Sequence, residues 1–137
     1  MKVRGIRNNN PGNIRHGDKW EGLSDIQSDS SFCVFQSPVY GIRAMAKILL
    51  NYQEKYQIDT IEKIISRWAP PNENDTLAYV HSVASALNVS AKQKVDLHGN
   101  GVLLANLIKA IIKHENGRQP YDDDMIFEGI RLAGVKC

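Results

Sequence analysis

The segment VLLANLIKAIIKHENG, residues 102–117, decides the fold of this chain. Its apolar residues recur three and four positions apart, the period of an amphipathic helix, and Asn116 with Gly117 is typical of a helix end. One stripe of this helix would contain Leu104, Ile108, Ile111 and Glu115. The sequence therefore places a glutamate where the next core residue is expected.

A carboxylic acid in that position has a specific chemical use. Shielding from water favours the protonated form, which a general acid requires, and glycoside-cleaving enzymes use such groups. We therefore interpret Glu115 as the candidate catalytic acid. In the alternative interpretation Glu115 extends into solvent at a frayed helix end, or pairs with Lys113 or Arg118. His114 is expected to face outward, and no other residues form a metal-binding set with it.

Four further helices are predicted from helical spacing and end signals. Ser37 and Pro38 suit the start of a long helix, Thr60 and Asp75 or Thr76 suit two helix starts, and Asp122 to Asp124 suit a last one. The expected helices cover 38–56, 61–68, about 76–87 and 125–134. With the helix at 102–115 they make about five in a mainly α chain.

The first 31 residues differ from the rest, because they are rich in the turn formers Asn, Gly, Asp and Ser. FCVF, residues 32–35, alternates like a short strand and could pair with residues near Trp20. We expect a small N-terminal hairpin or irregular lobe. At 137 residues the chain has the size of one domain, 1–137.

Composition narrows the class of protein. The net charge of +2 indicates no strong field for nucleic acid, although Lys2, Arg4, Arg7 and Arg15 form a local basic stretch. The sequence does not determine whether Cys33 and Cys137 form a disulfide. No motif for a metal or cofactor is present. Without a signal peptide or a membrane-spanning stretch, we expect synthesis in the cytoplasm, no membrane insertion and a monomer.

Several segments together resemble enzymes that cleave the glycan strands of peptidoglycan. NNNPGNIR, Trp20, FCVF and SPVYGIRAMAKILLNY look like part of peptidoglycan glucosaminidases, and the stretch from YGIRAMAKILLNY through RWAPPNENDTLAYVHSV is similar to goose-type lytic transglycosylases. In those families the catalytic glutamate precedes these segments, whereas HENG follows them here, so the order resembles a circular permutation. The whole pattern also resembles small phage-associated proteins of the lysozyme-like superfamily, which implies an α+β lysozyme-like fold.

The resemblance implies a substrate-binding cleft around Glu115 as general acid and base. The cleft residues it implies are Asn10, Asn13, Trp20, Trp68, Asn74 and Tyr79, and Arg15 belongs to the same Asn-rich segment. Each also has a plain structural interpretation. The asparagines can simply build a turn, and Trp68 and Tyr79 lie on apolar helix faces, whereas Trp20 is flanked by charged residues and better suits stacking on a sugar.

Three functions remain open at this stage. A lytic transglycosylase needs only Glu115, whereas a hydrolase needs a second carboxylate, for which Asp18, Asp25, Asp29 and Asp124 are available. A non-catalytic phage virion or cell-wall-binding module is the alternative from another class. If the chain is permuted, its two termini should lie on the same side of the domain.

Overall fold

The computed structural model describes residues 3–71 and 74–136, so Cys137, whose pairing the sequence leaves open, lies outside the described residues. Six helices form within this part: α1 (Arg4–Arg7), α2 (Pro38–Tyr56), α3 (Ile61–Trp68), α4 (Thr76–Leu87), α5 (Gly101–Asn116) and α6 (Asp123–Leu132). The mainly α prediction is confirmed, and the five predicted helices are α2 to α6. The short α1 was not predicted.

Polar side chains fix four helix starts, three of them at residues that the sequence indicated, whereas Asn100 was not predicted. Thr60, Asp75, Asn100 and Asp122 each accept a hydrogen bond from a backbone N–H in the first turn of α3, α4, α5 and α6, respectively. α2 begins instead with Pro38 at its first position and ends at Gln57 in the left-handed conformation. These local signals make the helix bounds readable from sequence.

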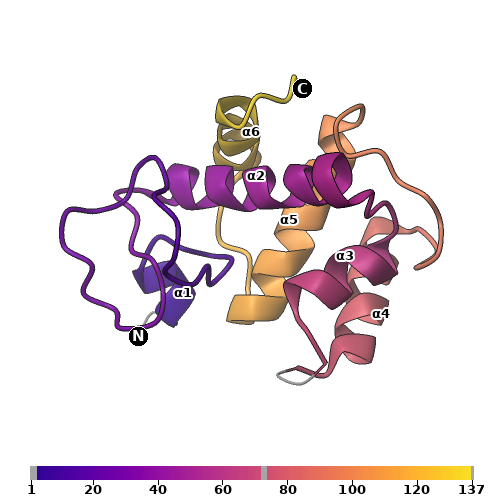
Figure 1. The fold of residues 1–137 in the computed structure, drawn as a ribbon, viewed down its shortest axis with the longest axis horizontal. Coiled ribbons are helices and arrows are strands. Elements are labelled where there is room, and N and C mark those ends of the chain that lie inside the picture. The colour runs from indigo at the N-terminus through magenta and orange to yellow at the C-terminus, as the bar shows by residue number, and fades with distance from the viewer. Residues whose placement is uncertain (1–2, 72–73, 137) are drawn as a thin grey trace.

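α5 is the central helix of the domain and contacts α1, α2, α4 and α6. Its buried side chains include Leu104, Leu107, Ile108, Ile111 and Ile112. The long α2 crosses it, with α6 packed on one side and the α3–α4 pair beyond (Figure 1). This apolar contact surface holds the end of α5, and therefore Glu115, in a fixed place.

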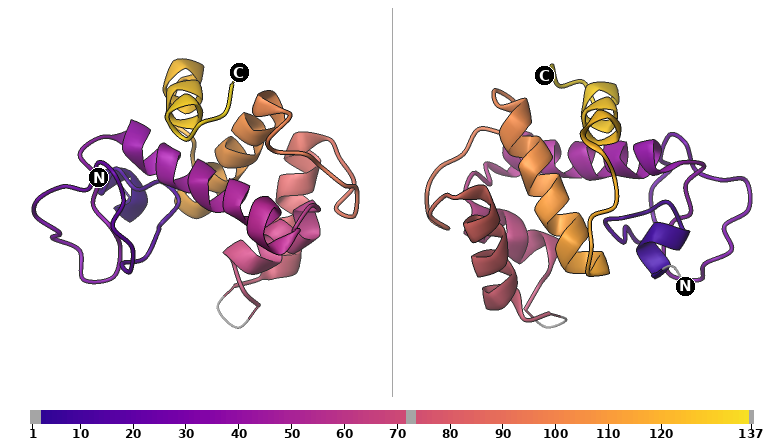
Figure 2. Two further views of the ribbon diagram at one scale, coloured as in Figure 1. Left: turned by 45° about the horizontal axis from the view of Figure 1, so that its top comes forward. Right: turned by 180° about the vertical axis from the view of Figure 1, so that it is seen from behind.

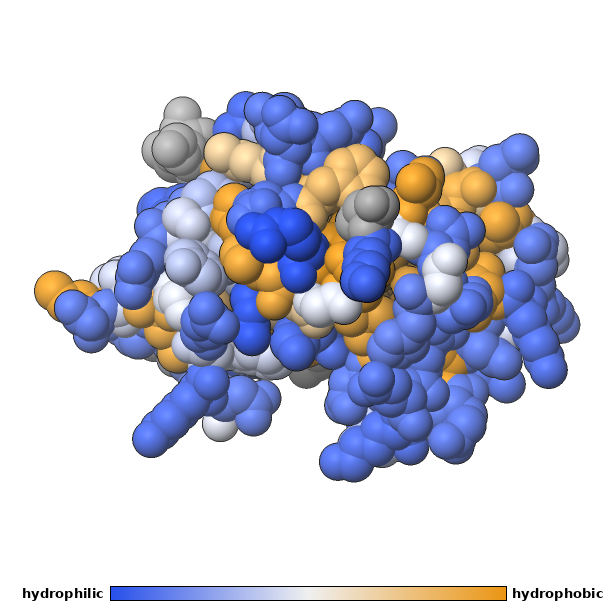
Figure 3. Space-filling view, turned by 90° about the horizontal axis from the view of Figure 1, so that it is seen from above, coloured by the Kyte–Doolittle hydropathy of each residue, from blue (hydrophilic) through white to orange (hydrophobic). Residues whose placement is uncertain are grey.

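Residues 3–36 form a lobe of loops around α1 at one end of α2 (Figure 1). Isolated bridges join Arg15 to Phe32 and Leu23 to Phe35, so the expected strand at 32–35 is reduced to single pairings in an irregular lobe. No helix in the described part of the chain has the length and apolar character needed to cross a membrane. Seen from above α2, the surface is mostly hydrophilic with scattered hydrophobic patches (Figure 3).

Asp29 organises this lobe from the inside. Its carboxylate accepts two hydrogen bonds from Arg4, both at 2.6 Å, one from Asn8 at 3.0 Å, and others from the backbone N–H groups of Ser31 and Phe32. The Arg4 guanidinium and these further donors hold the pKa of Asp29 well below its usual range. The ionised Asp29 side chain therefore has a structural role: it joins separate segments of the lobe.

We expect the lobe to be acid-labile because of Asp29. Since the pKa of Asp29 is lower in the folded chain than in an unfolded one, about 3.9, its stabilisation is complete above about pH 4 and is lost as the pH falls below it. Thermal unfolding followed by circular dichroism from pH 7 to pH 2.5 should show Asp29→Asn less stable at pH 7 and less sensitive to acid. Asp25→Asn, exposed in the same lobe, is the control; identical curves for wild type and Asp29→Asn would contradict the assignment.

The two ends of the described chain do not meet. The N-terminal end lies in the lobe, whereas the residues after α6 lie on the other side of α2, and Figures 1 and 2 agree on this separation. α1 packs on α5 within the lobe, whereas α6 packs mainly on α2 and also on α5, on the opposite side of α2 from the lobe. The expectation that both termini lie on the same side of the domain was wrong. This geometry therefore does not support the interpretation of the chain as a circular permutation.

Candidate functional site

Glu115 lies half-buried in the last turn of α5 and lines a groove of about 520 Å³. Two side chains from distant parts of the chain hold its carboxylate. The Asn13 amide donates to Oε1 at 3.1 Å and the Tyr79 hydroxyl donates to Oε2 at 2.8 Å. Each carboxylate oxygen is thus held by one donor while the group still faces the groove.

Asn13 reaches Glu115 because the Asn-rich turn packs on the end of α5. The Asn116 amide donates to the carbonyl of Pro11 at 2.8 Å and to that of Ile112 at 2.9 Å. Asn13 itself adopts a left-handed backbone conformation (φ 51°), which asparagine tolerates better than most residues. Asn116, which sequence reasoning missed as part of the site, therefore joins the lobe to the helix that carries the acid.

Tyr79 is a positioning residue buried beneath the groove. Only 1% of it is exposed, and its ring stacks on His114 with 3.6 Å between ring centroids. Burial and the neighbouring Glu115 charge raise the pKa of Tyr79, so the phenol stays protonated and remains a donor. The prediction that Tyr79 contacts substrate was wrong, because it has no open surface.

Asn10 also turns out to have no access to the groove. It is fully buried, its Nδ2 donates to the carbonyls of Ile14 and Cys33, and its Oδ1 accepts from the Ile14 N–H. All of these bonds hold the turn itself. The substrate-binding prediction for Asn10 was wrong, and the plain turn interpretation was correct.

The other predicted cleft residues divide between two grooves. Those that line the Glu115 groove are Asn13, Arg15, Trp68 and Asn74. Trp20 does not line it but borders a second groove, so the prediction that Trp20 belongs to the cleft of Glu115 was wrong. The reason is that the chain turns away after Arg15 and brings Trp20 to the far side of Ile48, the residue shared by both grooves.

Aromatic rings and cations complete the Glu115 groove. Sequence reasoning missed Phe32, Tyr52 and Arg67, although Arg67 directly precedes Trp68. The Arg15 guanidinium lies 5.0 Å from the centre of the Phe32 ring, and that of Arg67 lies 5.4 Å from the Tyr52 ring. Within the described residues neither arginine forms an ion pair, so their N–H groups are free to bind anionic groups of a ligand.

Among the described residues that line this groove, Glu115 is the sole acid. Asp124 is exposed in the first turn of α6, Asp25 is exposed in the lobe, Asp29 is bound to Arg4, and Asp18 lines the second groove. No group of three or more metal-binding side chains is found in the described part of the chain. The arrangement can donate and accept one proton at Glu115 beside a surface suited to sugar rings.

Fold and site together define a class: a mainly α domain with an irregular N-terminal lobe and, among the described residues, one hydrogen-bonded glutamate in a groove that both parts line. No protein family model matches the chain. It is 44% identical over 131 residues to Protein P5 of Pseudoalteromonas phage PM2, an alignment that covers 93% of this chain and 79% of that protein. The chain belongs to the family of this bacteriophage protein.

We expect Tyr79→Phe to lower the rate of any reaction that uses Glu115, because Oε2 loses its donor. The loss of one hydrogen bond to a charged group should lower kcat roughly tenfold. The matched control is Tyr121→Phe, since the Tyr121 hydroxyl is buried without a partner among the described residues and should not matter. Steady-state kinetics with melting temperatures would check both; equal losses in the two variants would contradict a positioning role.

Proposed function

We propose that this protein cleaves the glycan strands of peptidoglycan with Glu115 as general acid and base. The observation that carries the proposal is the Glu115 carboxylate, held by Asn13 and Tyr79 while it lines a groove of aromatic and cationic side chains. Trp68 offers a ring face on which a sugar can stack, beside the Phe32 and Tyr52 rings, which carry the arginine guanidinium groups. A bacteriophage relative supports the same proposal, because a phage has to pass the cell wall.

The reaction proposed is that of a lytic transglycosylase. Glu115 gives its proton to the glycosidic oxygen as the bond to the muramyl C1 breaks, and then takes the proton of the muramyl 6-hydroxyl as that oxygen bonds to C1. An anhydro ring closes and no water is consumed. A single acid suffices, which agrees with the described residues of the groove, whereas a muramidase-type hydrolysis consumes a water and would require a second carboxylate across the cleft.

The anionic character of the substrate agrees with the cations of the groove. Peptidoglycan carries carboxylates on its lactyl-linked peptides, whereas chitin is neutral. Arg15 and Arg67 rest on aromatic rings and form no ion pair with another described residue, and so suit a carboxylate-bearing glycan. We propose that the protein acts on the wall from a virion or after lysis of the host.

Digestion of purified peptidoglycan tests the proposal directly. The soluble products should contain anhydromuramyl ends by mass spectrometry, whereas a muramidase leaves reducing muramic acid and a glucosaminidase leaves reducing glucosamine. Walls of several types should be tried with protein whose fold is verified by circular dichroism. Binding of intact walls without any digestion would overturn the catalytic proposal in favour of a non-catalytic wall-binding module.

A further inference from the structure

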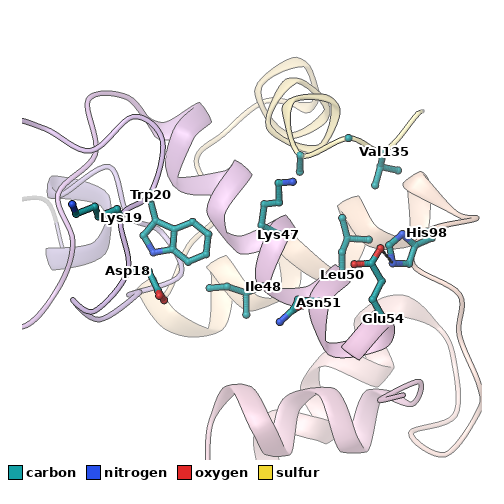
Figure 4. A pocket seen from close by; sticks show the side chains of 12 residues that line it. Asp18, Lys19, Trp20, Lys47, Ile48, Leu50, Asn51, Glu54, His98 and Val135 are labelled. Carbon is teal, nitrogen blue, oxygen red and sulfur yellow. Dashed lines mark ion pairs between the residues drawn. The ribbon is translucent and has the colours of Figure 1, made fainter. Parts of the chain in front are cut away.

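A second groove of about 650 Å³ runs along α2, next to the groove of Glu115 (Figure 4). Its base is formed by Ile48, Leu50 and Asn51 of α2. Trp20 and Asp18 stand at one end, and Glu54 with His98 at the other. Since Ile48 lines both grooves, the two share a border, and one branched ligand can occupy both at once.

This groove carries charges of both signs that are poorly paired within the described chain. Lys19, Lys47 and Asp18 form no ion pair, whereas Glu54 lies 3.6 Å from the imidazole of His98. The Trp20 indole N–H is buried without a hydrogen-bond partner among the described residues. Such a set fits a ligand that has both carboxylates and an amine, and does not fit a neutral saccharide.

We infer that the second groove binds the stem peptide of peptidoglycan while the sugar to which it is attached occupies the groove of Glu115. The inference rests on the proposed function and extends it to specificity. A stem peptide contains several carboxylates, and in diaminopimelate-type walls one free amine. Lys47 would bind a carboxylate and Glu54 the amine, while Trp20, Asp18 and Lys19 lie beside the start of the peptide near Ile48.

The dimensions agree with this assignment. Ile48 and Glu54 are six residues apart on α2, and at about 1.5 Å per residue the path between them is about 9 Å. An extended tetrapeptide spans about 13 Å, so it reaches from the shared border at Ile48 to the Glu54–His98 pair. The stem branches from the muramyl sugar next to the bond to be cleaved, which places its start at that border.

The two tryptophans provide one reporter for each groove, because Trp20 lines the second and Trp68 lines that of Glu115. In nitrogen-edited NMR spectra of Glu115→Gln protein, the free stem tetrapeptide should shift the Trp20 indole signal, and stem-free glycan should shift that of Trp68. Assignment comes from Trp20→Phe and Trp68→Phe. A tetrapeptide that shifts only Trp68, or neither signal, would overturn the inference.

Kinetics separate this inference from the proposed function. Lys47→Glu removes one attraction and adds a repulsion, so KM for stem-bearing strands should rise on the order of tenfold with kcat unchanged. Strands stripped of stems by an amidase should be cleaved equally by Lys47→Glu and wild type.

Lys63→Gln, exposed on α3 away from both grooves, is the control. Equal KM values on stem-bearing strands would reject the inference while cleavage itself stood, whereas no cleavage of any strand would reject the proposed function.

Discussion

Glu115→Gln should lose on the order of a hundredfold to ten-thousandfold of the peptidoglycan cleavage rate, because an amide cannot give or take the proton at the glycosidic oxygen. The fold should survive this change. The Gln Oε1 can accept from Asn13, and its Nε2 can donate to the Tyr79 oxygen, since a phenol serves as donor or acceptor. The measurement is the release of soluble fragments from purified peptidoglycan, with the melting temperature recorded alongside.

The matched control for this prediction is Asp124→Asn. It makes the same chemical change at an exposed carboxylate in the first turn of α6, outside the groove, and should keep most of the activity. Full cleavage by a well-folded Glu115→Gln protein would show that another group transfers the proton. Loss of activity in Asp124→Asn alone would indicate a hydrolase with a different arrangement of acids.

The helical part of the fold could be predicted from sequence because its signals are local. A cap residue such as Thr60 or Asp122 and the apolar period that follows lie within a few positions of each other. The predicted bounds of α2 and α3 match the structure. Arg4–Arg7 escaped prediction because a single turn has too few residues to show a period.

The place of Glu115 could also be predicted, whereas its neighbours could not. Its position on the apolar stripe of α5 follows from spacing alone, but Asn13 is 102 residues away in sequence and Tyr79 is 36 away. Nothing local distinguishes Asn13, which holds the carboxylate, from Asn10, which closes the turn. Only the packing of the lobe on α5, fixed by Asn116 and Pro11, separates the two roles.

Trp20 illustrates the same limit on the substrate side. A tryptophan among charged residues predicted an accessible ring, and the ring borders a groove, whereas its contact with a sugar stays a prediction. Which groove it borders depends on the path of residues 15–20 around Ile48, which is a tertiary feature. The resemblance to peptidoglycan-cleaving enzymes implied one cleft, whereas the predicted cleft residues line two grooves that share a border.

Gly41→Ala should unfold or displace the N-terminal lobe, the opposite of what the same substitution does in an ordinary helix. Alanine is favoured over glycine inside a helix by about 1 kcal/mol. At Gly41, however, an added Cβ would lie 2.2 Å from the Asn9 carbonyl oxygen and 2.9 Å from Cδ of Pro11. The first of these neighbours is backbone, so the Asn-rich turn has to move away from α2.

Such overpacking lowers the free energy of unfolding by about 1 to 3 kcal/mol, which exceeds the gain in helix propensity. The melting temperature should therefore fall by several degrees. Ser85→Ala, on the exposed face of α4, is the control and should leave the melting temperature unchanged or raise it slightly. Cleavage should fall together with stability in Gly41→Ala, because the displaced turn carries Asn13 away from Glu115. If the melting temperature of Gly41→Ala instead rose like that of an ordinary helix position, the lobe could not be packed on α2 as the structure has it, and the contact that holds Glu115 would have to be found elsewhere.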